Sequence, residues 1–133
     1  MLIESFVTRR EILSVEPGDT LAEAARRIWE RRVGSAVVIS GDDPPGIITE
    51  RDILRAVAEG ADPTGVKVGE YMTSRAVAIT PAWHVEDAAR TMIERGFRHL
   101  IVIEEESGEI AGILSIRDMM RAMLETKKRT LAG

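Results

Sequence analysis

The sequence contains no cysteine, no asparagine and no glutamine. Without cysteine, a disulfide scaffold and a cysteine-ligated zinc site are both excluded. Asparagine and glutamine are thermolabile, and their absence beside many arginines and glutamates predicts a thermophilic source. Only two histidines are present, and no spacing of histidines and carboxylates is typical of a metal site. The sequence therefore predicts no metal.

The chain also lacks an apolar run of the roughly 18–20 residues that a membrane span needs, and it shows no basic leader followed by an apolar stretch. We therefore expect a soluble, cytoplasmic protein without a membrane partner. The net charge of −4 argues against broad binding of nucleic acid or of an anionic membrane. A hydrophobic content of 44% in 133 residues allows one packed domain or two very small ones.

Signatures of catalysis are missing as well. The sequence shows no nucleophile paired with a base, and no glycine-rich phosphate loop followed by Lys and then Ser or Thr. We therefore predict that the protein is not an enzyme and carries no cofactor.

What the sequence does contain is an internal repeat. The stretch 46–52 consists of a glycine, two aliphatic residues, a hydroxyl residue, a spacer and then Arg-Asp, and it returns as 112–118. Pro17 and Pro81 occupy equivalent places before the two copies of the motif. The second copy is longer around 105–108, where a turn can hold an insertion.

Each copy predicts the order strand, helix, strand, strand, helix. Apolar spacing and capping residues, such as a box of Thr20 and Glu23, mark the helix starts. A unit of about 60 residues is marginal alone, so two copies that pair sheet against sheet around a pseudo-twofold axis would bury both faces. The predicted fold class is α/β (α+β). The expected strands are 12–15, 35–39, 47–48, 76–79, 98–103 and 110–114, and the expected helices are a short lead-in at 2–7, then 20–33 ended by Gly34, 50–59, 85–93 and 116–127.

Two repeats closed by Gly-aliphatic-aliphatic-(Thr/Ser)-x-x-Asp resemble a tandem pair of CBS domains, or Bateman module. The stretch 68–73, which ends in Met-Thr, is similar to the family's lead-in. The stretch 96–103 resembles its Gly-aliphatic-Arg-His-Leu-Pro-Val-Val strand, with Ile101 in place of the proline. The resemblance covers roughly 8–124. It places a first CBS domain at 8–60, a linker at 61–67, a second CBS domain at 68–126 and a C-terminal tail at 127–133.

In this family, such pairs bind adenosine compounds (AMP, ADP, ATP or S-adenosylmethionine) in clefts between repeats, and they regulate a partner or an attached domain. The resemblance therefore implies a stand-alone sensor of adenine nucleotides, with AMP as the leading ligand and ADP or ATP as further candidates. Two alternatives stay open: an S-adenosylmethionine sensor, and a protein-interaction or RNA-binding module without a nucleotide role. A homodimer through exposed, methionine-rich helix faces is expected, and the regulated partner is unknown.

Thr49 and Asp52 have two interpretations. In the first, they only cap the helix that starts at residue 50. In the second, the carboxylate accepts hydrogen bonds from the two vicinal hydroxyls of a ribose, and the hydroxyl side chain adds a contact. Capping alone does not explain why Gly, Arg and Asp recur together, and the resemblance favours the ribose. Ser115 and Asp118 have the same two interpretations.

Basic side chains near both motifs are candidates for phosphate contacts, because a guanidinium group matches phosphate oxygens. Arg51 and Arg117 each precede an Asp, and for both the alternative is an ordinary surface arginine. Arg98 and His99 make the repeats unequal, because the uncharged pair at 34–35 occupies their place in the first copy. The family resemblance implies that these basic residues face the nucleotide phosphates, and the alternative is a hydrogen-bonded strand histidine beside an arginine at the rim.

The resemblance makes each cleft composite, so that the Asp of one repeat faces strand residues of the other. It implies that Ile47 and Ile113 line the base pockets. The cleft of Asp52 is expected to hold phosphates better, because it would contain Arg98. The implied sets are Thr49, Arg51 and Asp52 with Val77, Phe97, Arg98 and His99, and Ser115, Arg117 and Asp118 with Leu13, Val33, Gly34 and Ser35.

Overall fold

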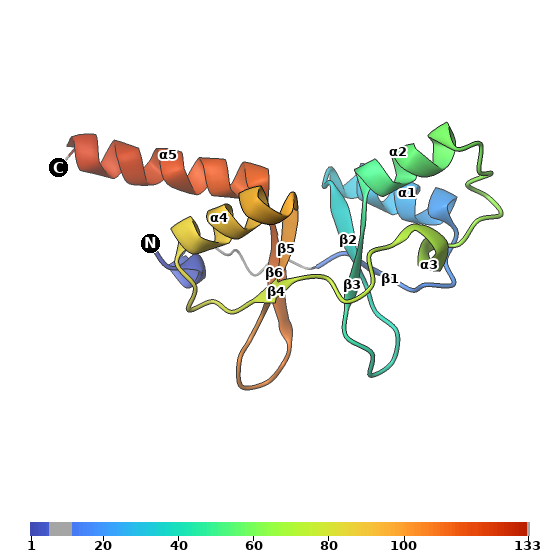
Figure 1. The fold of residues 1–133 in the computed structure, drawn as a ribbon, viewed down its shortest axis with the longest axis horizontal. Coiled ribbons are helices and arrows are strands. Elements are labelled where there is room, and N and C mark those ends of the chain that lie inside the picture. Colours follow the sequence, from blue (N-terminus) through green and yellow to red (C-terminus); the bar gives the residue numbers. More distant parts are fainter. Residues whose placement is uncertain (6–11, 133) are drawn as a thin grey trace. The chain divides into compact units, whose positions relative to one another are not determined.

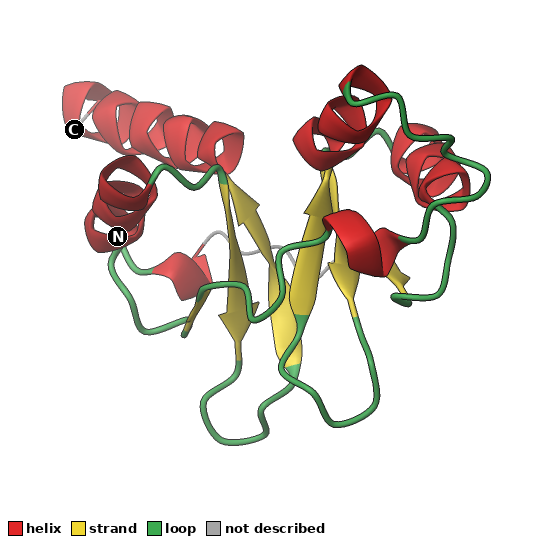
Figure 2. Cartoon of the chain, turned by 45° about the vertical axis from the view of Figure 1, so that its right-hand side comes forward, coloured by secondary structure: helices red, strands yellow, loops and turns green. Residues whose placement is uncertain are grey.

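The computed structural model describes residues 1–5 and 12–132, with side chains described as far as Glu125. The described residues form two compact units. Residues 12–76 form one, named here the Thr49 unit, and residues 1–5 together with 77–132 form the other, named the Ser115 unit. Each contains a three-stranded mixed sheet, and Figure 2 shows the helices that accompany the strands. The predicted α+β class with two equivalent repeats is therefore confirmed.

The sheet of the Thr49 unit has the order β1-β2-β3. β1 is parallel to β2, so α1 is the crossover between them, and β3 returns antiparallel to β2 after the predicted turn. Figure 1 labels its elements, which are β1 (Ser14–Val15), α1 (Leu21–Arg31), β2 (Ser35–Val38), β3 (Gly46–Thr49), α2 (Glu50–Ala58) and α3 (Val68–Tyr71).

Alternation along the strands decides which side chains of this unit meet the helices. Val38 and Ile48 lie in a core with Leu21 of α1, and all three are buried. Val37 and Ile47, one position away, are also buried but lie on the opposite face of the sheet. The sheet therefore has two apolar faces, which explains the continuous apolar run of β2 in the sequence.

The Ser115 unit repeats this plan with the sheet order β4-β5-β6. β4 is parallel to β5, and β6 is antiparallel to β5. The register shifts between Val102 and Ile103, close to the longer turn of the second copy. Its elements are the 3-10 helix η1 (Ile3–Ser5), β4 (Ala78–Ile79), α4 (Val85–Arg95), β5 (His99–Ile103), β6 (Ile110–Ser115) and α5 (Ile116–Ala132).

The start of the chain belongs to the core of the Ser115 unit. Ile3 is fully buried in a cluster with Ile79, Leu100 and Met119. Its N–H donates to the carbonyl of Trp83 at 2.8 Å. The predicted lead-in helix at 2–7 is present as η1 only, and its residues Phe6 and Val7 lie outside the described residues.

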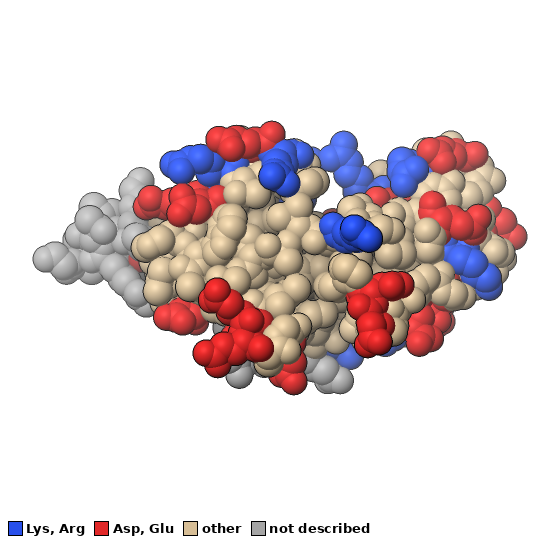
Figure 3. Space-filling view, turned by 60° about the horizontal axis from the view of Figure 1, so that its bottom comes forward, with Lys and Arg blue, Asp and Glu red and all other residues tan. Residues whose placement is uncertain are grey.

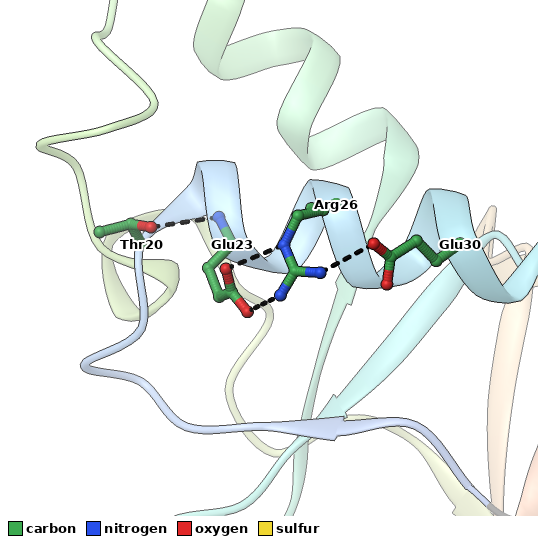
Figure 4. A network of polar contacts seen from close by, with 4 residues as sticks. All are labelled: Thr20, Glu23, Arg26 and Glu30. Atoms are coloured by element: carbon green, nitrogen blue, oxygen red, sulfur yellow. Dashed lines mark hydrogen bonds and ion pairs between the residues drawn. The ribbon is translucent and has the colours of Figure 1, made fainter.

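The start of α1 shows how side chains define a helix end. Thr20 Oγ1 accepts the N–H of Glu23 at 3.1 Å, as the capping pattern predicts. The Glu23 carboxylate does not complete the predicted box, because it pairs with Arg26, which also donates to Glu30 at 2.8 Å (Figure 4). These contacts with Glu23 and Glu30 raise the pKa of the Arg26 guanidinium.

Two helix ends differ from the prediction. α1 ends at Arg31 rather than at Gly34, because Arg32 adopts left-handed backbone with a φ of 56° and its N–H bonds to carbonyls of the preceding turn. α5 continues to Ala132, beyond the expected end near Lys127. Within the described residues, no helix is long and apolar enough to cross a membrane.

The buried faces of α2 and α4 are narrower than the apolar spacing predicts. Leu54 and Val57 of α2 and Ile93 of α4 have the apolar spacing of a helix face, but their side chains are 67%, 55% and 74% exposed. Ala56 of α2 and Met92 of α4 are buried instead. Apolar periodicity therefore predicts both helices correctly, but it does not distinguish the exposed apolar residues of each helix from the buried ones.

Candidate functional site

The first copy of the repeated motif forms a reciprocal cap at the junction of β3 and α2. Thr49 is the N-cap of α2, with extended backbone. Its N–H donates to Asp52 Oδ2 at 2.9 Å and its hydroxyl donates to the same oxygen at 3.0 Å. In return, the N–H of Asp52 donates to Thr49 Oγ1 at 3.2 Å. Thr49 and Asp52 therefore cap α2, and the contact with a ribose stays a prediction.

The second copy forms the same arrangement at the junction of β6 and α5. The N–H and hydroxyl of Ser115 donate to Asp118 Oδ2 at 2.8 and 3.0 Å. The N–H of Asp118 donates to Ser115 Oγ at 3.1 Å. The two boxes, Thr49 with Asp52 and Ser115 with Asp118, therefore have the same geometry. Their hydroxyl residues differ only by one methyl group.

Capping uses only the Oδ2 atom of each Asp carboxylate, and the Oδ1 atom takes no part in it. Among the described residues, no hydrogen bond or ion pair reaches Oδ1 of Asp52 or of Asp118. Both side chains are half-buried, so they are fixed by the box and still reach the surface. Each box thus presents an anionic acceptor, held in place, that can receive hydrogen bonds from a diol.

Strand pairing places a different pair of residues beside each box of the same unit. Ser35 is the register partner of Thr49, and the carbonyl of Gly34 accepts the N–H of Glu50 at 2.9 Å. Thr49 therefore has uncharged neighbours on β2. Ser35 is buried, at 6% exposure.

In the Ser115 unit the corresponding neighbours are basic. His99 is the register partner of Ser115, and the carbonyl of Arg98 accepts the N–H of Ile116 at 2.9 Å. The structure therefore brings Arg98 and His99 to the box of their own repeat. Their implied combination with Asp52, and that of Gly34 and Ser35 with Asp118, joins residues of different units and stays a prediction.

The remaining predicted residues fall into three groups. Leu13 lies in the core of the Thr49 unit, and Val77 and Phe97 pack against the core of the Ser115 unit. Strand alternation places Ile47 and Ile113 on sheet faces opposite their own helices. Arg51, Arg117 and Val33 are exposed, and within the described part of the chain neither arginine forms an ion pair.

One feature near the site was not predicted from the sequence. Residue 73 pairs with Ile47 of β3, and the side chain of Met72 approaches Gly46 closely. The recurring glycine at the start of the motif was a signal for this close approach, because glycine is needed where two backbones meet without room for a Cβ.

A surface hollow lies beside α1 in the Thr49 unit. The hollow has a volume of about 270 Å³ and is lined by Leu13 and by four charged residues of α1, so it shares only Leu13 with the predicted set. Among the described residues, no group of three or more His, Asp or Glu side chains is placed to hold a metal ion.

Comparison with known proteins agrees with the duplicated geometry. A family model described as CBS domain matches residues 3–59 and again 68–125. An uncharacterised 17.7 kDa protein of Acidianus ambivalens is 39% identical over 122 residues, which are 91% of this chain and 73% of that protein. An uncharacterised protein of Methanopyrus kandleri is 30% identical over 117 residues, which are 86% of this chain and 59% of that protein.

A solved structure shows the same fold. The CBS domain protein PAE2072 from Pyrobaculum aerophilum, complexed with AMP, is 31% identical and superposes with a TM-score of 0.79 over 89% of each chain. The archaeal relatives fit the thermophilic source predicted from the missing amide residues.

Proposed function

The chain belongs to the CBS domain family, with one copy at 3–59 and another at 68–125, and we propose that it is a non-catalytic, cytoplasmic sensor that binds AMP and signals to a partner protein. ADP and ATP are further candidate ligands. The observation that carries this proposal is the unused Oδ1 atom of Asp52 and of Asp118, each held by an identical capping box. A cap alone needs only Oδ2, whereas a ribose diol needs a fixed acceptor that is still open.

The phosphate of the nucleotide is assigned to arginine side chains near the boxes. Arg98 precedes the register partner of Ser115, while the equivalent position near Thr49 is Gly34. Arg51 and Arg117, each in the first turn of a helix that follows a box, are further donors. The base is assigned to the apolar sheet faces that carry Ile47 and Ile113, with the combination across repeats that the family resemblance implies.

The proposal predicts that AMP binds the purified protein. Isothermal titration calorimetry with AMP, ADP, ATP and S-adenosylmethionine should give saturable heat with AMP, and AMP should raise the thermal midpoint because it binds only the folded state. Adenine without ribose should bind much more weakly, because the diol contact is missing. Saturable binding of S-adenosylmethionine with none of AMP would replace the proposed ligand, and absence of binding by all four would refute the nucleotide function.

RNA binding is the alternative that the charge distribution weighs against. The net charge is −4, and on the face drawn in Figure 3 basic side chains are interspersed with acidic ones and do not form one continuous patch. Binding of RNA normally requires such a basic footprint. Salt-sensitive binding of single strands without competition by AMP would favour RNA over the nucleotide.

Self-association is assigned to the exposed apolar stripes of the helices. Equivalent positions of the two repeats carry large apolar side chains, and a soluble chain rarely leaves such repeated surface uncovered. Met119 of α5 is buried and belongs to the core, so it is not part of these stripes. The stripes are Trp29, Leu54 and Val57 in the Thr49 unit and Ile93, Met120 and Met123 in the Ser115 unit, with exposures between 46% and 74%.

The homodimer predicts a specific response to charge on these stripes. Trp29→Glu and Ile93→Glu should each shift the protein toward monomer, because burying a carboxylate in an apolar interface is unfavourable. Light scattering after size exclusion measures the change. Asp42→Lys, in an exposed hairpin turn, is the control and should leave the mass unchanged. A dimer that survives the double replacement of Trp29 and Ile93 would show that the stripes are not the interface.

A further inference from the structure

The segment 72–76, named here the latch, follows α3 and lies along the outer edge of β3. Ile47 N–H donates to the carbonyl of Thr73 at 3.0 Å, and Thr73 N–H donates to the carbonyl of Ile47 at 2.9 Å. Ala76 N–H donates to the carbonyl of Pro45 at 3.1 Å. Because β2 occupies the other edge of β3, the latch acts as a further, short antiparallel strand of the Thr49 unit. Figure 1 shows the chain passing from α3 through this segment to β4.

The glycine of the motif makes this pairing possible. A Cβ at Gly46 would lie 2.4 Å from Met72 Cε and 2.7 Å from the carbonyl oxygen of Thr73. The methionine side chain can move, but the carbonyl cannot move without breaking the pairing with β3. Gly46 is therefore required here for the approach of the latch.

The latch is nevertheless held by few contacts. Met72 at its start packs against the core of the Thr49 unit. Thr73, Ser74 and Arg75 are exposed, so little apolar surface is buried along the middle of the latch. Arg75 has a φ of 51°, in the left-handed region that side chains other than glycine, asparagine and aspartate rarely adopt. A segment with few buried contacts and a strained residue opens at a lower free-energy cost than the sheet it pairs with.

The latch connects the candidate ribose carboxylate to the other unit. β3 has four residues, with the latch paired at Ile47 and the capping box formed at Thr49. In the other direction the latch continues directly into Val77, whose carbonyl accepts the N–H of Ile101 of β5 at 3.1 Å. One short stretch of chain therefore touches both the strand that ends in the box and the sheet of the Ser115 unit.

We infer that the latch is a ligand-sensitive element: nucleotide bound at Asp52 orders the box and β3, and thereby tightens the pairing between Ile47 and Thr73. This inference rests on the proposed function, because it takes the same ligand at the same carboxylate. By linkage, opening of the latch lowers the affinity of the Asp52 site by the same factor by which the ligand favours closure. The occupied state is thus transmitted along the backbone into Val77.

Amide hydrogen exchange of the wild-type chain and of two variants at residue 73 tests the inference. Thr73→Pro removes the N–H that bonds to Ile47, and Met72 already has a φ of −68° and a ψ of 160°, which a following proline accepts. Thr73→Ala is the matched control, because it keeps every backbone bond. Without ligand, Thr73→Pro should accelerate exchange of the Ile47 and Asp52 amides about fivefold or more, while the Leu100 amide of the other unit keeps its rate and Thr73→Ala changes neither.

AMP should slow exchange of the wild-type Thr73 amide by a factor of about five or more. Thr73→Pro should weaken AMP binding at the Asp52 site by about fivefold or more relative to Thr73→Ala. A factor of about five is the low end of typical couplings. If AMP binds and the Thr73 amide keeps its rate, the latch is refuted while the nucleotide function stands. If AMP does not bind, the nucleotide function fails and the ligand-free comparison decides: equal Asp52 exchange in the two variants would refute the link between latch and box.

Discussion

Replacing both Asp52 and Asp118 by alanine should abolish measurable AMP binding, and each single replacement should weaken binding at its own site by about a hundredfold or more. Two ribose hydroxyls would each lose a hydrogen bond to a charged acceptor, worth about 1.5–3 kcal/mol apiece. At about 1.4 kcal/mol per tenfold change in affinity, even the low end of that range gives two orders of magnitude. Titration calorimetry with AMP on the three variants measures the effect.

The effect on binding must be separated from the loss of a helix cap. Removing either Asp also removes the acceptor for the N–H and hydroxyl of Thr49 or Ser115, which should cost about 1 kcal/mol of stability. Thr20→Ala is the control, because the Thr20 hydroxyl also accepts an N–H at a helix start, that of Glu23 in α1, and has no assigned ligand contact. It should lower the thermal midpoint and leave AMP affinity unchanged. Asp variants that lose stability but bind AMP normally would show that the boxes only cap helices.

Arg98 distinguishes the two ways of combining the repeats. The family resemblance implies that Arg98 serves the ligand of Asp52, whereas strand register places it beside the box of Asp118. In either case Arg98→Ala should weaken AMP binding more than Ser35→Ala, because only the arginine supplies charge. A double-mutant cycle separates the alternatives: the coupling energy of Arg98 should appear with the Asp whose ligand it contacts.

Sequence reasoning succeeded where the determinants are local. The two boxes follow from a hydroxyl residue and a carboxylate three positions apart, and the structure forms both. The strands β2, β3, β5 and β6 follow from short apolar runs bounded by turn residues. Repetition of the same signals then gave the duplicated α+β plan without any knowledge of distant contacts.

Sequence reasoning failed where a structural feature depends on residues distant in the chain or on competition between neighbouring residues. Leu54 and Ile93 lie on amphipathic helices, but spacing alone does not show which edge of an apolar stripe meets the core. The end of α1 was assigned to Gly34 because glycine is the usual C-terminal residue, yet Arg32 adopts the left-handed conformation two positions earlier. The contact of residue 73 with β3 leaves no periodic signal, so only the recurring Gly46 hinted at it.

The placement of Ile3 is the most consequential of these distant contacts. The family match assigns residue 3 to the first copy, yet Ile3 is fully buried with side chains from β4, α4, β5 and α5 of the second. Backbone bonds from Ile3 to Trp83 and from Val85 to Met1, at 2.8 and 2.9 Å, hold the segment against the start of α4. The first residues of the chain therefore complete a core whose other members begin at Val77.

Ile3→Ala should accordingly destabilise the Ser115 unit by about 2–4 kcal/mol, within the range measured for truncation of a buried isoleucine. The two tryptophans make the effect assignable, because Trp83 lies in the Ser115 unit and Trp29 in the Thr49 unit. In a Trp29→Phe background Trp83 alone reports on urea unfolding by fluorescence, and in a Trp83→Phe background Trp29 alone does. Ile3→Ala should lower the urea midpoint more when Trp83 is the probe. Glu4→Ala, at an exposed neighbour, is the control and should shift neither transition. If Ile3→Ala lowers the urea midpoint no more than Glu4→Ala does, the chain start contributes nothing to this core, and the second repeat must be stable on the contacts of 77–132 alone.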